Sequence, residues 1–350
     1  MTLYTHRESF EDAVLLSSRH CTSRVATQIF IPSSPKPRFM ASSVLIDVDP
    51  GNDDAVLIAL AAATERLDIE AVTTVAGNVG LEHTTRNARA ILEWLGETDV
   101  PVAPGADAPL VRELETASHV HGPRGLHTQP PEPTADPVAA AGANVIVERA
   151  RANPGELTLL AVGPLTNVAL ALALEPELPE LLDDLQVMGG AAFVTGNASP
   201  TAEYNFYVDP EAARRVVRQA GPKLVGLDVT NHTTVPSDTI REWASSDEPL
   251  RTLASWLAYA APENVDDALD EGTPPRVHDA TVGVDQLADV LEFESYPAEV
   301  ETYGSHRGAL ACDDRPRTDR EPNVEVAVDI DASVFRAELV DALQSLNIES

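Results

Sequence analysis

Cysteine and long apolar runs are scarce in this sequence, and each scarcity excludes a class of protein. Two cysteines in 350 residues, Cys21 and Cys312, cannot staple a disulfide-rich fold, and such scarcity is typical of a reducing cytosol. No run approaches the roughly 18 apolar residues of a membrane-spanning helix. Residues 14–16 form too short an apolar stretch for a signal peptide, and no small-residue cleavage site follows them. We therefore expect a cytoplasmic protein.

Positive charge is also scarce. The chain carries 24 Lys and Arg against 56 Asp and Glu, a formal net charge of -32, and its only lysines are Lys36 and Lys223. Such a surface repels phosphate backbones and anionic lipid headgroups, so neither nucleic acid nor a membrane is an expected partner. Acidic residues spread over the whole chain predict a halophile-like protein, because high salt screens their mutual repulsion. The alternative is an ordinary acidic protein.

Residues 1–39 differ in composition from the rest of the chain. They hold three acidic residues and five basic ones, and the proline-rich stretch 31–37 interrupts any regular element. Met40 then precedes a short polar stretch and an apolar run. We expect residues 1–39 to be a disordered extension or the product of a misassigned start, with a regulatory arm as the alternative. Residues 40–350 are predicted to form a single domain.

Strand and helix patterns alternate from residue 44 onward. The pattern predicts strands at 44–48, 69–76, 157–162, 185–188 and 224–229, and helices at 55–63, 84–95, 166–174, 210–219 and 281–291. Closing strands are predicted at 298–303, 308–312 and 324–330, before a terminal helix at 335–346. This alternation indicates an α/β fold, a mostly parallel, Rossmann-like central sheet with helices on both faces. Residues 231–277 interrupt it, and we expect a helical insertion over one end of the sheet.

Four carboxylates lie within eight residues at the end of the first predicted strand. The segment begins at Asp47 and reads DVDPGNDD, with a Pro-Gly turn before the predicted helix. Functional loops of such sheets lie at the carboxyl ends of strands, and converging carboxylates repel one another without a cation. Several hard oxygen ligands on a rigid turn suit Ca²⁺ best and Mg²⁺ second. The alternative is a helix N-terminus with a solvated acidic face.

Two other interpretations of this segment fail on spacing. An EF-hand loop starting at Asp47 requires Gly at its sixth position and Glu at its twelfth, where Asn52 and Ile58 stand. An aspartyl-phosphate phosphatase would place Thr or Val where Gly51 stands and would need a phosphate-neutralising lysine. Lys223 is the only lysine after residue 40, so phosphoryl transfer is not expected.

Several motifs in register resemble the inosine–uridine nucleoside hydrolase family, which cleaves the N-glycosidic bond of ribonucleosides. They span residues 47 to about 313 and read DVDPGNDDA from Asp47, VAGNV from Val75, HGPRGL from His121, VGPLTN from Val162, MGG from Met188, GN from Gly196, AEYN from Ala202, DPEAA from Asp209, HDA from His278, and ETYG with a later RG from Glu301. Two features depart from the family pattern. Pro123 and Arg124 replace the usual small or acidic residues, and residues 231–277 match no known subgroup.

The resemblance implies a role for particular residues of this chain. It implies a Ca²⁺ ion held by Asp49, Asp54, Asp279 and the main-chain carbonyl of Val162, with Asp47 in support. It implies that the ribose is bound by Asp53, Asn78, His121, Asn197, Glu203 and Asn205. Asp49 would act as general base on a metal-bound water, and His278 as the acid that protonates the leaving base. Taken singly, each polar residue has the alternative of an ordinary loop hydrogen bond, and His278 that of only orienting Asp279.

The resemblance favours a calcium-dependent ribonucleoside hydrolase, and two alternatives stay open. One is a catalytically idle nucleoside- or ribose-binding protein, although a complete set of aspartates argues against such decay. The other is a hydrolase of a different N-riboside. The family also implies a homodimer or homotetramer. Preference between purines and pyrimidines depends on the unmatched residues 231–277, where Trp243, Trp256 and Tyr259 either stack on a base or, as their helical spacing favours, pack in the core.

Overall fold

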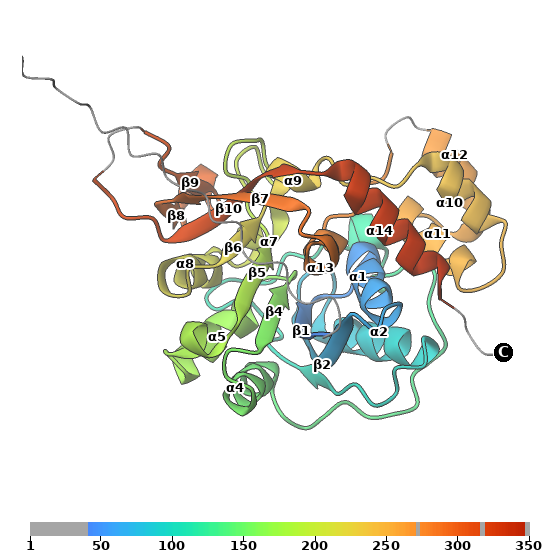
Figure 1. Ribbon diagram of the computed structural model, residues 1–350, viewed down its shortest axis with the longest axis horizontal. Helices are drawn as coiled ribbons and strands as arrows, with labels where there is room; N and C mark the ends of the chain where they lie inside the picture. The colour runs from blue at the N-terminus through green and yellow to red at the C-terminus, as the bar shows by residue number, and fades with distance from the viewer. Residues whose placement is uncertain (1–40, 271–273, 316–318, 347–350) are drawn as a thin grey trace, which may run out of the picture. The chain divides into compact units, whose positions relative to one another are not determined.

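A central eight-stranded sheet forms the framework of the protein (Figure 1). The computed structural model describes residues 41–270, 274–315 and 319–346. The chain divides into two units, residues 1–38 and 39–350, and every described residue belongs to the second. The proposed extension at 1–39 therefore lies outside the described residues. The sheet has the order β3-β2-β1-β4-β5-β6-β10-β7, formed by β1 (Ser42–Val48), β2 (Leu67–Thr74), β3 (Val102–Pro104), β4 (Leu157–Ala161), β5 (Asp184–Met188), β6 (Lys223–Val225), β7 (Leu291–Tyr296) and β10 (Val324–Ile330).

Neighbouring strands are parallel throughout the sheet except at one edge, where β7 runs antiparallel to β10. β1 lies near the centre, hydrogen-bonded to β2 on one side and to β4 on the other. Two further strands, β8 (Ala298–Val300) and β9 (Leu310–Cys312), form a separate antiparallel pair. The predicted mostly parallel α/β fold is confirmed, and the chain from residue 41 onward folds as a single domain.

Helices cover both faces of the sheet because the central strands are apolar on both sides. In β1, Val44, Ile46 and Val48 belong to one buried cluster and Leu45 to the other, as alternation along a strand requires. The first face is packed against α1 (Asn52–Ala62), α2 (Leu81–Trp94), α13 (Ala280–Ala288) and α14 (Ala332–Gln344). The second is packed against α4 (Gly142–Ala152), α5 (Thr166–Leu174) and α8 (Pro210–Gln219) (Figure 1).

The strand predicted at 224–229 is shorter than expected, because the chain turns at Gly226. β6 ends at Val225, and a short helix, α9 (Leu227–Thr230), begins directly after the glycine. A Cβ at Gly226 would lie 2.8 Å from the carbonyl oxygen of Gly190, so only glycine permits this approach. The Asp228 carboxylate then accepts the backbone N–H groups of Ala192 and Phe193, which ties α9 to the loop after β5.

The helix predicted at 281–291 also ends early. α13 stops at Ala288, Asp289 takes a left-handed conformation with φ of 46°, and β7 starts at Leu291. Asp285 holds this turn by accepting the backbone N–H of Leu291 at 3.0 Å. Strand β7 was not predicted, although its alternating sequence LEFESY carries the period of a half-exposed edge strand.

The predicted insertion at 231–277 is helical. It contains α10 (Ser237–Ala244), α11 (Leu250–Ala258), the short turn η1 (Pro262–Asn264) and α12 (Val265–Asp270), and α11 packs against α1. Trp243 and Trp256 are buried among the core residues, which confirms core packing for both. None of the described helices is long and apolar enough to cross a membrane.

Candidate functional site

The turn between β1 and α1 holds its carboxylates through its own backbone. Asp54 lies in the first turn of α1, and its carboxylate accepts the N–H of Gly51 at 2.9 Å and that of Asp49 at 3.1 Å. These donors close the loop at the positive end of the helix. Because the loop folds back on Asp54, Asp49 and Asp53 lie on the side of the turn that faces a large cavity.

Asp49 lies in a narrow space that only glycines permit. A Cβ at Gly77 would lie 2.1 Å from one carboxylate oxygen of Asp49, and a Cβ at Gly163 2.9 Å from the other. These glycines follow β2 and β4, the two strands that flank β1. The backbone N–H of Asn78 donates to Asp49 Oδ2 at 2.7 Å. Three strand ends therefore hold this carboxylate in place.

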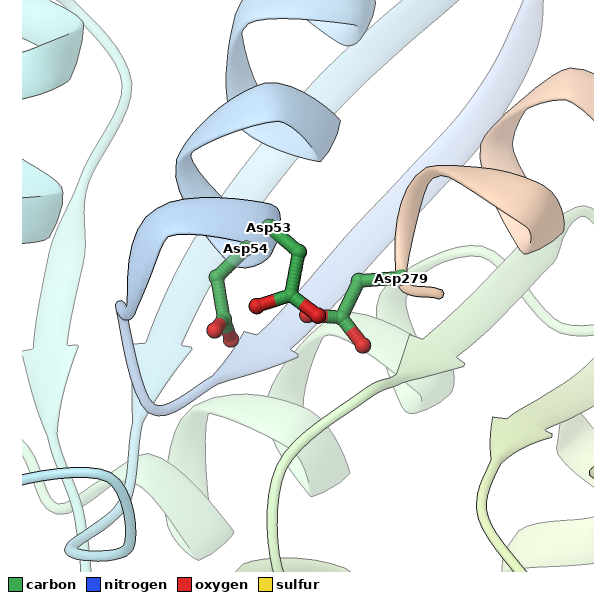
Figure 2. A group of neighbouring side chains, drawn as sticks. All are labelled: Asp53, Asp54 and Asp279. Carbon is green, nitrogen blue, oxygen red and sulfur yellow. The ribbon is translucent and has the colours of Figure 1, made fainter. Parts of the chain in front are cut away.

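Asp279 joins this group from a distant part of the sequence. Figure 2 shows Asp53 and Asp54 at the start of α1 facing Asp279, which immediately precedes α13. One carboxylate oxygen from each of the three lies within 4.8 Å of the others, and all three residues are buried. Oxygen ligands in such a group are the type that Ca²⁺ and Mg²⁺ prefer.

The electrostatics of the group fit a bound cation. Burial and the charge of Asp54 raise the pKa of Asp49 well above its usual value. Burial and the neighbouring aspartates likewise raise the pKa of Asp279, and that of Asp54 to about 7. A group of buried carboxylates that repel one another is stabilised by a divalent cation, which removes the repulsion and the cost of burial together. The residues present therefore fit the metal that the sequence predicted.

Asp47 lies apart from the cavity. Its Oδ1 accepts from Thr73 at 2.5 Å and from Asn167 at 2.8 Å, while Oδ2 has no hydrogen-bond partner among the described residues. Burial raises the pKa of this carboxyl group to about 7. Asp47 thus connects β1, β2 and the start of α5, and its supporting role stays a prediction.

Glu203 and Asn205 line the same cavity at the start of α7 (Tyr204–Val208). The Glu203 carboxylate accepts the backbone N–H groups of Asn205, Phe206 and Gly190 at 2.9 to 3.2 Å, and burial raises its pKa to about 7. Asn205 donates through Nδ2 to the carbonyl oxygens of Val162, at 2.6 Å, and Met188. The predicted carbonyl ligand Val162 therefore lies at the cavity wall, beside a predicted sugar ligand.

The remaining predicted sugar ligands line the same cavity. Asn78 donates through Nδ2 to Asp54 at 3.2 Å and to the carbonyl oxygen of Asp49 at 3.3 Å. His121 is buried and accepts the backbone N–H of Asn52. Asn197 is exposed at the rim. All the predicted site residues except Asp47 and Asp54 line this cavity, which has a volume of about 800 Å³.

His278 and Tyr259 line the cavity near the aspartates. Nδ1 of His278 lies 2.8 Å from the hydroxyl of Thr230, and burial lowers the pKa of the imidazole. Tyr259 comes from the end of α11, and burial followed by the charges of Asp53 and Asp279 raises its pKa. Its ring lies 5.5 Å from that of His121, centroid to centroid. Of the three aromatic residues considered in the insertion, Tyr259 alone reaches the cavity.

Sequence reasoning missed several residues that hold this site together. Asn52 and Asn167 stand inside recognised motifs, so their positions could have been noticed, but neither was given a role. Tyr204 likewise stands inside the recognised AEYN motif without a role, whereas Thr230, Tyr207 and Glu115 carry no local signal. Their contacts join segments that are distant in sequence, such as the 48 positions between Thr230 and His278.

The group of buried aspartates beside the carboxyl end of β1 is of a kind that can hold a metal ion, and comparison with known proteins identifies the class of enzyme. Residues 44–337 match the family model described as inosine-uridine preferring nucleoside hydrolase, so the chain belongs to this family of N-glycosidic hydrolases. The resemblance seen in the sequence is confirmed.

Individual relatives extend this similarity over nearly their whole length. The chain is 37% identical over 309 residues to the pyrimidine-specific ribonucleoside hydrolase RihA of Salmonella arizonae, covering 87% of this chain and 99% of that protein. Its fold is similar to that of the plant nucleoside hydrolase PpNRh1, with a TM-score of 0.79, 29% identity, and coverage of 86% and 98%. The purine-preferring ribonucleoside hydrolase of Gardnerella vaginalis also gives a TM-score of 0.79, at 25% identity and coverage of 87% and 98%.

Proposed function

We propose that this protein hydrolyses the N-glycosidic bond of ribonucleosides in a calcium-dependent reaction that yields ribose and the free nucleobase. The convergence of buried carboxylates from two distant segments carries the proposal: Asp49, Asp53 and Asp54 follow β1, and Asp279 precedes α13. Such a group is costly without a cation, and the wide cavity beside it has room for a nucleoside.

Asp49, Asp54, Asp279 and the carbonyl of Val162 are the proposed ligands of the ion. Bound calcium would polarise a water molecule and the ribose hydroxyls in the site. Asp53 is proposed to accept hydrogen bonds from the ribose hydroxyls, although its proximity to Asp54 and Asp279 also suits a metal ligand. Elemental analysis of variants at these positions separates the two assignments of Asp53.

Asp49 is the proposed general base. Its Oδ2 is held by the Asn78 N–H, and Gly77 and Gly163 leave room for the carboxylate at the cavity, where a water molecule can approach it. As the C1′–N bond breaks, positive charge develops on the ribose ring, and the carboxylates around it stabilise that charge. Glu203 and Asn205 at the start of α7 are proposed to bind the rest of the sugar, together with Asn78, His121 and Asn197.

His278 is the proposed acid for the departing base. Thr230 contacts Nδ1, which leaves Nε2 as the nitrogen for a bound nucleobase. Because burial lowers the pKa of His278, its protonated form is a stronger acid than an exposed histidine but is less populated at neutral pH. Tyr259, beside His121, is the second candidate for this proton.

Pyrimidine ribonucleosides are the proposed first choice of substrate. The relative at 37% identity is named as pyrimidine-specific, whereas the purine-preferring relative is 25% identical.

We also propose a cytoplasmic location from the scarcity of cysteine, a homodimer or homotetramer from the family resemblance, and a folded domain that comprises residues 40–350.

Release of reducing sugar from a panel of nucleosides tests this function. The purified protein is incubated at high salt with calcium and uridine, cytidine, inosine, adenosine or nicotinamide riboside. Ribose from the first four supports the proposal, whereas ribose from nicotinamide riboside alone favours another N-riboside hydrolase. Binding of nucleosides without any ribose would instead indicate a catalytically idle binding protein.

A further inference from the structure

A group of polar side chains joins three separate segments at the wall of the cavity. Glu115 lies between β3 and the short helix α3 (Ser118–His121), Tyr204 and Tyr207 lie on α7, and Arg307 follows the turn η2 (Gly304–His306). We call these four residues the Glu115 clasp. Glu115, Tyr204 and Tyr207 line the cavity.

Arg307 and Tyr207 hold the Glu115 side chain from two directions. Arg307 Nη2 donates to Glu115 Oε1 at 2.5 Å, and the Tyr207 hydroxyl donates to Oε2 at 3.3 Å. The Arg307 guanidinium lies over the Tyr207 ring, 3.8 Å from its centroid. An exposed ion pair alone contributes little, but stacking on the ring orients the guanidinium for this carboxylate.

Tyr204 holds the backbone of the same residue. Its hydroxyl donates to the carbonyl oxygen of Glu115 at 3.0 Å. Tyr204 stands between Glu203 and Asn205, which face the proposed sugar site. The start of α7 therefore carries the proposed sugar ligands and also holds the backbone of Glu115 at the cavity wall.

Within the clasp, Glu115 precedes the short helix α3, which ends at His121. The backbone N–H of Ala117 donates to the carbonyl oxygen of Asn78, and the N–H of His121 donates to the carbonyl oxygen of Ala117. Glu115 is joined to Ala117 along the chain through Thr116, and Ala117 to His121 by this hydrogen bond, so the position of Glu115 bears on that of His121.

We propose that Glu115 is a positioning residue of this site, which fixes the segment 115–121 and so presents His121 to the bound nucleoside. The inference rests on the proposed role of His121 as a substrate ligand. Glu115 itself takes no part in bond breaking. It acts through the backbone, and Arg307 and Tyr207 act through Glu115.

Variants of the clasp test this inference by nucleoside affinity. We expect Glu115→Ala to raise the dissociation constant of uridine, followed by intrinsic fluorescence, roughly three- to thirty-fold. Glu115→Gln and Arg307→Lys should give smaller changes, because each keeps part of the contact. The matched control is Arg151→Gln, which removes the ion pair between the exposed Arg151 on α4 and Glu175 at the end of α5. It should leave the affinity unchanged and match Glu115→Ala in melting temperature.

A double-mutant cycle with His121 separates positioning from a merely structural role. If Glu115 acts through His121, the variant carrying both Glu115→Ala and His121→Ala should bind uridine as His121→Ala does. Additive losses would overturn the inference, as would unchanged affinity in Glu115→Ala. Binding without turnover in the wild type would overturn the proposed hydrolysis and still test Glu115. A wild type that binds no nucleoside would overturn both.

Discussion

The backbone N–H of Asn52 donates a hydrogen bond to Nδ1 of His121 at 3.0 Å, across 69 positions of sequence. A backbone N–H can only donate, so Nδ1 of His121 is an acceptor, and the neutral ring carries its proton on Nε2. Burial lowers the pKa of His121, which keeps the ring neutral at neutral pH. The turn at the start of α1 therefore determines which nitrogen of His121 can donate to a ligand.

This tautomer is directly measurable. In ¹⁵N-histidine-labelled protein at neutral pH, we expect His121 to show a protonated Nε2 and an unprotonated Nδ1, with His121→Gln used to assign its signals. His127, whose Nδ1 lies 3.0 Å from the Asn52 side-chain amide, serves as a second histidine with a fixed partner. A proton on Nδ1 of His121 would contradict the hydrogen bond from Asn52.

Chelation should abolish activity, and added calcium should restore it. Three carboxylates are proposed to hold the ion, so Asp49→Ala and Asp279→Ala should each lose bound calcium and turnover together. Elemental analysis and equilibrium calcium binding measure the loss. The control is Asp238→Asn, which changes a fully exposed carboxylate on α10. Full activity in excess chelator, in protein free of metal, would refute calcium dependence.

Removal of residues 1–39 should have no effect on the enzyme. The family match begins at residue 44, and the composition changes sharply at residue 40. A chain starting at Met40 should therefore match the full chain in melting temperature and in kcat/KM. A chain starting at Ile46 loses the first half of β1, which pairs with both neighbouring strands, and should fail to fold. Unfolding of the longer truncated chain would show that residues 1–39 contribute to stability.

The turnover of His278 and Asp49 variants should depend differently on the leaving group of the substrate. An aryl riboside such as p-nitrophenyl riboside leaves as a stable anion and needs little help from an acid. His278→Ala should reduce uridine or inosine turnover by about 10²–10⁴-fold and largely spare the aryl substrate. Asp49→Ala should hydrolyse neither substrate, because Asp49 is proposed to accept a proton from the attacking water, which both reactions need. If His278→Ala slowed the hydrolysis of both substrates equally, His278 would be a packing residue and not the acid. Tyr259 would then be the favoured acid.

The layered fold could be predicted from periodicity because most of its strands are buried on both faces. Apolar runs such as residues 44–48 and 157–161 need no tertiary information to be recognised. Strand β7 also carries an alternating period, but the early end of α13 and the start of β7 could not be found in this way. Their boundary depends on a left-handed Asp289 and on the Asp285 carboxylate, which accepts an N–H six positions later.

The site was predictable where its residues stand in short motifs, and less so where they act through contacts. The aspartates from Asp47 to Asp54 are close in sequence, at the end of one strand, so a group of oxygen ligands could be predicted from the sequence there. The Thr230–His278 and Asn52–His121 contacts depend on how loops approach in space, and the clasp at Glu115 joins residues up to 192 positions apart. No local sequence pattern predicts contacts between residues so far apart in the chain.

The most direct test of the account is the release of products from uridine in calcium-loaded, phosphate-free buffer. The account predicts that free ribose and uracil appear in equal amounts for the wild type, and that Asp49→Asn, which keeps the shape of the side chain but removes its basic oxygen, reduces both by about 10²-fold or more. Undiminished release by Asp49→Asn, or cleavage that requires phosphate and yields a ribose phosphate, would contradict hydrolysis by this carboxylate site.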